Sequence, residues 1–228
     1  MKILLINSNQ FKQPRPVLPF GLCLVASSLE KAGHNVEVLD LNFVKNIEKE
    51  IDETIQNFYP KIIGVSVRNI DNGAGYNTLF LLDNVKKRVI EPCKKLNIPI
   101  VLGGGAIGIN PEEILDYFGL NYAIKGDGEL AFVELAKRFE NKISLKDCPG
   151  LVERRNGKTI QNNPIFCVQN LDELPFSNIY HWIDLKPYLY FNTAIPIQTK
   201  RGCALNCSYC TYNNIEGKKF RLRSPKKL

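Results

Sequence analysis

Short apolar runs alternate with amphipathic segments along the first 140 residues of the chain. Lys2–Ser8 contains the short apolar run Ile3–Ile6, as expected of a strand that is buried on both faces of a parallel sheet. Four further runs predict strands in the same way: Asn35–Leu41, Lys61–Val67, Ile98–Leu102 and Tyr122–Lys125. Apolar residues recur at helical spacing in five segments: Phe20–Ala32, Lys45–Phe58, Thr78–Leu96, Pro111–Phe118 and Gly128–Glu140.

Five consecutive strand–helix units predict an α/β fold with a doubly wound, five-stranded parallel sheet. We expect the flavodoxin-like, or Rossmann-like, strand order 2-1-3-4-5. Ligands of such sheets bind beyond the carboxyl ends of the strands. Those ends carry the loops 7–19, 68–76 and 103–110, which are rich in Gly, Pro, Asn or Ser.

The pattern changes after residue 141. Gly150–Asn162 predicts a β-hairpin around Asn156-Gly157. Residues 163–194 have no long periodicity and read as a linker, anchored by Leu174, Phe176, Trp182 and Tyr188. Ile195–Thr199 is expected to be the first strand of a new domain. We therefore expect three parts: a domain over 1–141, a hairpin and linker over 142–194, and the start of a second domain over 195–228.

The net charge of +7 suggests a nucleic-acid binder, but its distribution argues against one. Eight basic residues and one acid lie after Thr199 and account for the whole excess. A basic tail of this kind is typical of a solvated face, so nucleic acid is not an expected partner. The chain opens on a short apolar run with no signal or membrane segment. Its odd number of cysteines indicates a reducing cytoplasm and no disulfide framework.

Three cysteines, Cys203, Cys207 and Cys210, are spaced C-x3-C-x2-C. A four-iron cluster normally takes four thiolates, so three would leave one iron open. The alternatives are unrelated thiols or a zinc site, which would need a fourth Cys or His; none follows Cys210. The run, with Tyr209 before its third cysteine, resembles the signature of the radical S-adenosylmethionine (SAM) superfamily. That resemblance implies a 4Fe-4S cluster whose open iron binds SAM, and an external electron donor that triggers formation of a deoxyadenosyl radical.

The first domain lacks a dinucleotide fingerprint, because residues 8–19 contain no glycine. Three glycines instead follow the fourth strand, at Gly103–Gly105. Contiguous glycines allow a backbone to approach a bulky ligand closely, although they also suit a tight turn. Cys23, Cys93, Cys148 and Cys167 are expected to be ordinary buried or half-buried thiols.

Together with the cysteine run, three stretches resemble the cobalamin-binding domain that precedes a radical SAM barrel: 65–72, 102–105 and 125–129. The resemblance implies that the corrin ring lies over the strand ends, with the nucleotide tail beside the sheet, toward strands three and four. The candidate cofactor-binding residues are Ser66, Arg68, Asn69, Asp71, Asn72, Gly103, Gly104, Gly105, Gly126, Glu129 and Tyr209.

Mutase-type cobalamin domains carry a His after the first strand, and residues 7–21 contain none. His34 is expected to be a surface turn residue. Cobalamin should then bind with its own base displaced and without a protein His, with Arg68, Asn69 or Asp71 facing its lower side. Asp71 and Asp127 are expected to be turn or cap residues and Glu129 a capping residue, so no catalytic residue is assigned.

The resemblance implies a cobalamin-dependent radical SAM enzyme, most simply a methyltransferase acting on an unreactive carbon of an unidentified small-molecule or peptide substrate. A complete barrel takes roughly 200–250 residues. Residues 195–228 hold only its beginning, so we expect these 228 residues alone to be inactive. Two alternatives remain open: a tRNA methylthiotransferase-like enzyme, and a non-catalytic cobalamin carrier or sensor.

Overall fold

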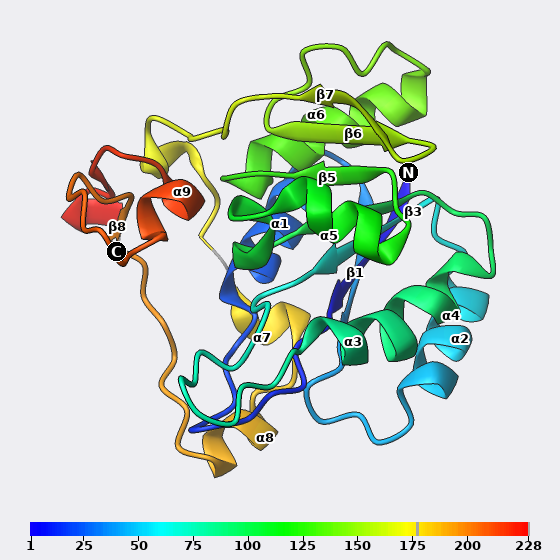
Figure 1. Cartoon of the computed structure of the whole chain (residues 1–228), viewed down its shortest axis with the longest axis horizontal. Coiled ribbons are helices and arrows are strands. Elements are labelled where there is room, and N and C mark those ends of the chain that lie inside the picture. The colour runs from blue at the N-terminus through cyan, green and yellow to red at the C-terminus, as the bar shows by residue number, and fades with distance from the viewer. Residues whose placement is uncertain (177, 228) are drawn as a thin grey trace.

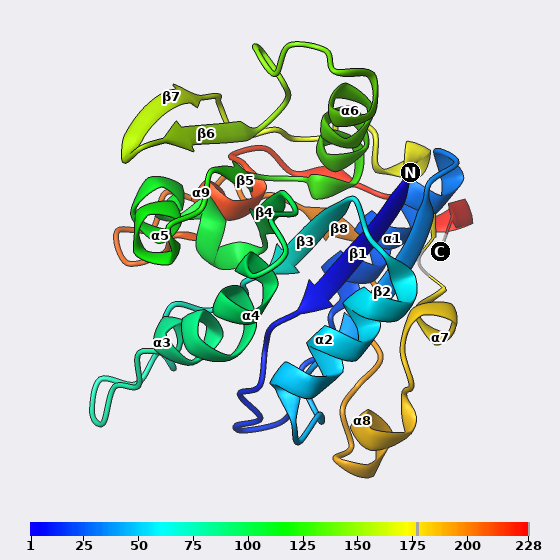
Figure 2. The ribbon, with the colours of Figure 1, turned by 90° about the vertical axis from the view of Figure 1, so that its right-hand side faces the viewer.

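The computed structural model describes residues 1–176 and 178–227. Its main sheet has seven strands in the order β2-β1-β3-β4-β5-β6-β7 (Figures 1 and 2). The first five are parallel and confirm the predicted doubly wound order: β1 (Lys2–Asn7), β2 (Asn35–Asp40), β3 (Ile62–Ser66), β4 (Ile100–Gly103) and β5 (Tyr122–Ile124).

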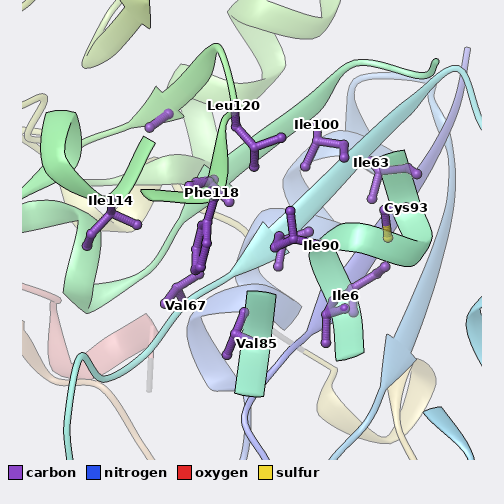
Figure 3. Packing of buried hydrophobic residues seen from close by; sticks show 14 of the residues in the cluster. Ile6, Ile63, Val67, Val85, Ile90, Cys93, Ile100, Ile114, Phe118 and Leu120 are labelled. Carbon is purple, nitrogen blue, oxygen red and sulfur yellow. The ribbon is translucent and has the colours of Figure 1, made fainter. Parts of the chain in front are cut away.

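Helices cover both faces of the sheet because successive strand residues point to opposite sides. Leu4 and Ile6 of β1 pack on one face, against α2 (Ile47–Phe58) and α5 (Pro111–Phe118). Figure 3 shows this side of the core, including Ile63, Ile90 and Phe118. Ile3 and Leu5 pack on the other face, against α1 (Phe20–Lys31) and α6 (Gly128–Asn141).

The helix predicted over 78–96 is shorter and interrupted. It comprises α3 (Leu82–Val85), a π-helical turn η1 (Lys86–Ile90) and α4 (Glu91–Lys94). Pro92 has no backbone N–H to donate, and the π turn ends two residues before it. Residues 78–81 belong instead to a loop in which Asp71 and Phe80 form an isolated bridge.

The predicted hairpin forms and joins the sheet, so the expectation of five strands was two too few. Strand β6 (Leu151–Arg155) pairs antiparallel with β5, and β7 (Lys158–Asn162) completes the edge. Arg154 fixes the hairpin to α5: its Nε lies 2.7 Å from Oδ1 of Asp116. Leu151 and Val152 are fully buried, which explains why the hairpin packs on the sheet instead of standing apart.

Residues 163–194 carry the short helices α7 (Ile179–Trp182) and α8 (Lys186–Tyr190), which pack beside α1. Leu174 and Tyr188 are buried as predicted, and the Tyr188 hydroxyl donates to Asp40 Oδ2 at 2.7 Å. Phe176 is 57% exposed, so its prediction as an anchor was wrong.

The predicted strand 195–199 was also wrong. Among the described residues, no strand pairs with it, and a strand requires a hydrogen-bonded neighbour. The paired strand lies directly after this segment, where β8 (Lys200–Arg201) pairs with β9 (Arg221–Leu222) around the short helix α9 (Tyr212–Glu216). Figure 1 shows this C-terminal segment, in orange and red, at one end of the sheet. Across residues 1–176 and 178–227, no helix is long and apolar enough to cross a membrane.

Candidate functional site at the strand ends

A cavity of about 400 Å³ opens at the carboxyl ends of the parallel strands. Its rim contains the last residues of three strands, Asn7, Ser66 and Gly103. This is the edge at which doubly wound sheets bind ligands, and the volume lies within the range of small-molecule sites, roughly 300–1,000 Å³.

The cavity also extends between the sheet and the helices α1 and α6, where Leu5, Gly64 and Phe132 line it. A Cβ atom on Gly64 would lie 2.6 Å from side-chain atoms of both Leu5 and Phe132, so a larger residue at this point of β3 would force these side chains to move. Gly64 was not among the residues predicted from the sequence. A lone glycine inside an apolar strand was the available signal, because it marks a close approach.

The three glycines after β4 have different environments. A Cβ on Gly103 would meet no atom within 4 Å, so Gly103 presents bare backbone to the cavity. Gly104 has φ +97°, and a Cβ there would lie 2.5 Å from the carbonyl oxygen of Val67. The space around Gly105 is intermediate, because a Cβ there would lie 3.2 Å from the carbonyl oxygen of Arg68. Gly103 therefore makes an open floor for a flat ligand, while Gly104 allows the loop to turn.

The structure brings most of the predicted cofactor-binding residues together. Those that line the cavity are Ser66, Arg68, Gly103, Gly104, Gly105, Gly126 and Glu129. Those outside it are Asn69, Asp71, Asn72 and Tyr209, which stay predictions without a structural placement in the site. Asp71 acts as the expected turn residue, because its Oδ1 accepts from the Gly73 N–H at 2.7 Å. Tyr209 is 88% exposed.

One wall of the cavity comes from the C-terminal segment, through Gln198, Arg201, Ile215 and Glu216. Ile215 of α9 packs against Gly108, whose Cβ would lie 2.9 Å from the Ile215 Cα. The segment that carries the cysteines therefore contacts the loop after β4 directly.

A buried charge cluster links that wall to the β5–α6 loop. Arg201 binds Glu129 through both terminal nitrogens, with Nη1 at 3.1 Å from Oε2, and its Nη1 lies 2.9 Å from Asp127 Oδ1. All three side chains are at most 6% exposed. Burial alone would lower the pKa of Arg201, but the hydrogen bond and charge of Glu129, with Asp127, raise it above its ordinary value. The guanidinium therefore stays charged.

A second arginine completes this cluster. Arg221 pairs with Asp127 Oδ2 and donates to the carbonyl oxygen of Val168 at 2.7 Å. Asp127 occupies the N-cap position of α6, as expected of a cap residue, but its side chain makes no cap bond there. It accepts instead from the Val168 N–H at 2.7 Å. The expectation of a wholly solvated basic tail was wrong, since Arg201, Arg221 and Arg223 are buried. The sequence pattern did not reveal these partners because they are distant along the chain.

The cysteine loop lies at the surface, with Cys203 half-buried and Cys207 and Cys210 exposed. The Cys203 N–H donates to the Gly217 carbonyl oxygen at 3.0 Å, and the Tyr212 N–H donates to Cys210 Sγ at 3.5 Å. Within the described parts of the chain, no three His, Cys, Asp or Glu side chains converge on a single metal ion. In an iron–sulfur cluster each thiolate binds its own iron, so three spaced, accessible thiols fit a cluster better than a mononuclear metal.

The remaining cysteines are ordinary thiols, as expected. Burial raises the pKa of Cys23 and Cys93 to about 12 and that of Cys148 to about 11. Burial also raises the pKa of half-buried Cys167.

The prediction for His34 was wrong: this side chain is 9% exposed, with Nδ1 at 3.2 Å from the Met1 amino group. Burial, followed by the charge of that amino group, lowers the pKa of His34. His34 precedes β2 and so lies at the opposite end of the sheet from the cavity.

Comparison with known proteins gives concordant results. Residues 14–136 match the B12 binding domain family. The chain is 27% identical over 215 residues to an uncharacterized methyltransferase of Pyrococcus horikoshii, covering 92% of this chain and 44% of that protein. It is 30% identical over 162 residues to tryptophan 2-C-methyltransferase of Streptomyces laurentii, covering 67% of this chain and 26% of that protein.

Among solved structures, the radical SAM methyltransferase TsrM from Kitasatospora setae, with cobalamin and a 4Fe-4S cluster bound, superposes with a TM-score of 0.88 at 26% identity. The match covers 99% of this chain and 45% of that one. The chain thus spans less than half the length of each of these relatives. These findings confirm the resemblance to cobalamin-binding radical SAM proteins, and because the matched region is more than half of the chain, the chain belongs to the B12-binding domain family.

Proposed function

We propose that these residues are the cobalamin-binding portion of a radical SAM enzyme, a methyltransferase that acts on an unreactive carbon. One observation carries the proposal: the strand-end cavity of a B12-binding domain is walled by the segment that holds the cysteine motif. A cofactor in this cavity would lie beside the cluster loop, as a reaction using both would require.

The cavity fits cobalamin in two respects. Gly103 leaves an open backbone floor where a corrin ring can approach, and the part of the cavity between the sheet and helices α1 and α6 is lined by apolar side chains such as Leu5 and Phe132, where a nucleotide tail could lie. Arg68 is exposed after β3 and lines the same cavity, which supports its proposed role on the lower side of the ring. Neither histidine lines the cavity, in agreement with binding that needs no protein imidazole.

Cys203, Cys207 and Cys210 are assigned to the cluster, because none of the three thiols is fully buried and Cys210 Sγ already accepts from the Tyr212 N–H, a contact that suits thiolate ligation. When bound, the 4Fe-4S cluster and SAM would supply radical chemistry and cobalamin a transferable methyl group. The chain's own residues shape the cavity, hold the loop and keep Arg201 charged at its wall.

The names of the relatives favour methyl transfer. They include tryptophan 2-C-methyltransferase and the hopanoid C-3 methylase of Methylococcus capsulatus, which is 24% identical over 239 residues. The methylthiotransferase alternative would need a second set of cluster cysteines. Cys23, Cys93 and Cys148 are instead buried in separate core clusters. The substrate remains a small molecule or peptide of unknown identity, and an external electron donor is part of the proposal.

A cytoplasmic location is also proposed. All seven cysteines, each within the described residues, are free thiols, a state that a reducing compartment maintains.

The test is direct binding of the cofactor. The purified protein is mixed with hydroxocobalamin or methylcobalamin, desalted, and its visible spectrum recorded. We expect stoichiometric retention of both. Retention no greater than that of an unrelated protein carried through the same column would refute cobalamin binding.

A further inference from the structure

The charge cluster of Arg201, Arg221, Asp127 and Glu129 joins two segments that are far apart in the sequence. Arg201 and Glu129 are 72 residues apart, and Arg221 and Asp127 are 94 apart. Each of the four side chains is at most 6% exposed. Buried ions are strongly destabilising unless fully paired, so the two segments must come together for either pair to be tolerated.

The partners of the cluster are satisfied throughout. Gln198 Oε1 accepts from Arg201 Nε at 2.8 Å, and the carbonyl oxygens of Val168 and Glu216 accept from Arg221 at 2.7 and 2.5 Å. A fully satisfied buried polar network is rigid and permits one arrangement of its members. The cluster is therefore suited to fixing the position of the segment that contains Arg201.

That segment leads directly into the cysteine loop. The Gly202 N–H donates to Glu216 Oε2 at 3.0 Å, and the Tyr212 hydroxyl donates to the same oxygen at 2.6 Å. Gly202 has φ +80°, and a Cβ there would overlap the Lys219 carbonyl oxygen, so the chain has little freedom between Arg201 and Cys203. We therefore expect a displacement of Arg201 to shift Cys203 as well.

On its other side the cluster borders the strand-end cavity. Asp127 lines this cavity from the N-cap of α6 and Glu129 from its first turn, whereas Arg201 and Glu216 line it from the C-terminal segment. A ligand that filled the cavity up to this wall would therefore meet the same groups that hold the cysteine loop.

We propose that Arg201 is a positioning residue that couples occupancy of the strand-end cavity to the conformation of the cysteine loop. The inference rests on the proposed function, since the ligand is taken to be cobalamin. When Arg201 is seated on Glu129 it completes the cavity wall and holds Cys203 in place. When Arg201 is released from Glu129, the cavity wall and the fixed position of Cys203 are lost together. A ligand that packs on the completed wall stabilises the seated state, and the coupling is reciprocal.

The test measures thiol reactivity and not enzyme activity. Iron-free protein is alkylated with iodoacetamide with and without saturating methylcobalamin, and the rate at each cysteine is followed by peptide mass spectrometry. Cys93 is fully buried in the core, so its alkylation reports global unfolding and serves as the internal reference. We expect methylcobalamin to slow alkylation of Cys203 about fivefold relative to Cys93, the low end of typical coupling.

Two variants weaken the cluster while keeping a polar group of similar size: Arg201→Lys and Glu129→Gln. The matched control is Arg154→Lys, because Arg154 is also buried and bidentate to a carboxylate, Asp116, but does not line the cavity. Both cluster variants should bring the Cys203 protection factor close to one, whereas Arg154→Lys should leave it at the wild-type value. Equal protection in Arg201→Lys and wild type would overturn the proposal, as would absence of protection in wild-type protein that retains methylcobalamin.

Failure of the proposed function gives a different result. If the wild type retains no methylcobalamin, cobalamin binding and coupling to it are both refuted. In that case the rates of Cys203 alkylation without ligand still test whether Arg201 positions the cysteine loop. Arg201→Lys should accelerate alkylation of Cys203 relative to Cys93 several-fold and Arg154→Lys should not, and equal rates in the two variants would refute this positioning role.

Discussion

The carbonyl oxygen of Val67 lies where a side chain on Gly104 would have to be, at 2.5 Å from the position of its Cβ. The same oxygen accepts from the Ala106 N–H at 3.2 Å, and the Val67 N–H donates to the Gly103 carbonyl oxygen at 2.8 Å. The chains leaving β3 and β4 are therefore bound to each other beyond the end of the sheet. Within the glycine run, Gly104 serves this connection and Gly103 serves the cavity.

We predict that Gly104→Ala destabilises the fold. The substitution combines a φ of +97° with a backbone overlap, so we expect a loss of roughly 2–4 kcal/mol in the free energy of unfolding. Urea denaturation followed by circular dichroism measures this. A midpoint equal to that of the wild type would show that the loop relaxes freely and that this account of Gly104 is wrong.

Gly103→Leu should act on the ligand and not on the fold. Its Cβ would enter open space in the cavity, so the unfolding midpoint should stay near that of the wild type while retention of cobalamin falls sharply. Gly75→Leu is the matched control, because Gly75 also has free space around it but does not line the cavity. Normal cobalamin retention by Gly103→Leu would place the corrin ring elsewhere.

The sheet could be predicted well from the sequence because each strand is indicated by residues within its own segment. Apolar runs such as Lys2–Asn7 and the glycines after β4 identify strands and a strand-end site without knowledge of any partner. The prediction of a strand at 195–199 failed because β-branched and apolar residues indicate only a preference for extended backbone. Whether a neighbouring strand is present is not encoded within the segment.

The charge cluster could not be predicted either, because its partners lie far apart in the sequence. The sequence shows Asp127, Glu129 and Arg201 as surface-type residues, and only tertiary packing brings them together out of solvent. His34 follows a helix C-terminal glycine, a setting typical of exposed turns. Its side chain is nevertheless covered by Met1 and Glu140, which begin and end the first domain in the sequence, and its Nδ1 lies 4.0 Å from Glu140 Oε2.

Acid sensitivity should depend on His34. Its pKa in the folded state is lowered from 6.5 by burial, so the neutral form contributes stability that is present above 6.5 and lost as the pH falls below that value. Between about pH 7.5 and 5.5 the urea midpoint of His34→Gln should therefore fall less than that of the wild type. The control is His181→Gln, whose side chain is 53% exposed. Identical acid sensitivity of the two variants would contradict the assignment.

Cobalamin should bind in the base-off form without help from either histidine. His34 lies at the far end of the sheet, and His181 on α7 contacts Glu30, outside the cavity. We expect bound methylcobalamin to show a base-off spectrum that is unchanged in His34→Ala and in His181→Ala. A base-on spectrum of the bound cofactor, or a spectral change in either variant, would mean that a nitrogen ligand reaches the cobalt.

The cluster and cobalamin sites should be separable at Cys207. This thiol is exposed and the structure gives it no core contact, so Cys207→Ala should leave the unfolding midpoint and cobalamin retention unchanged. It would remove one of three thiolates, and iron bound after anaerobic reconstitution with iron and sulfide should drop. Cys167→Ala is the control, because Cys167 is half-buried near Glu216 but is not assigned to the cluster.

On residues 1–228 we also expect the absorbance of the reconstituted cluster to be weak and short-lived. Cys207 and Cys210 are exposed, so a cluster bound to them would have little protection from solvent. If the wild type binds iron when assayed directly after reconstitution and Cys207→Ala binds the same amount, the ligand assignment is refuted. A stable, stoichiometric four-iron cluster on these residues would instead show that exposure of Cys207 and Cys210 does not weaken the site.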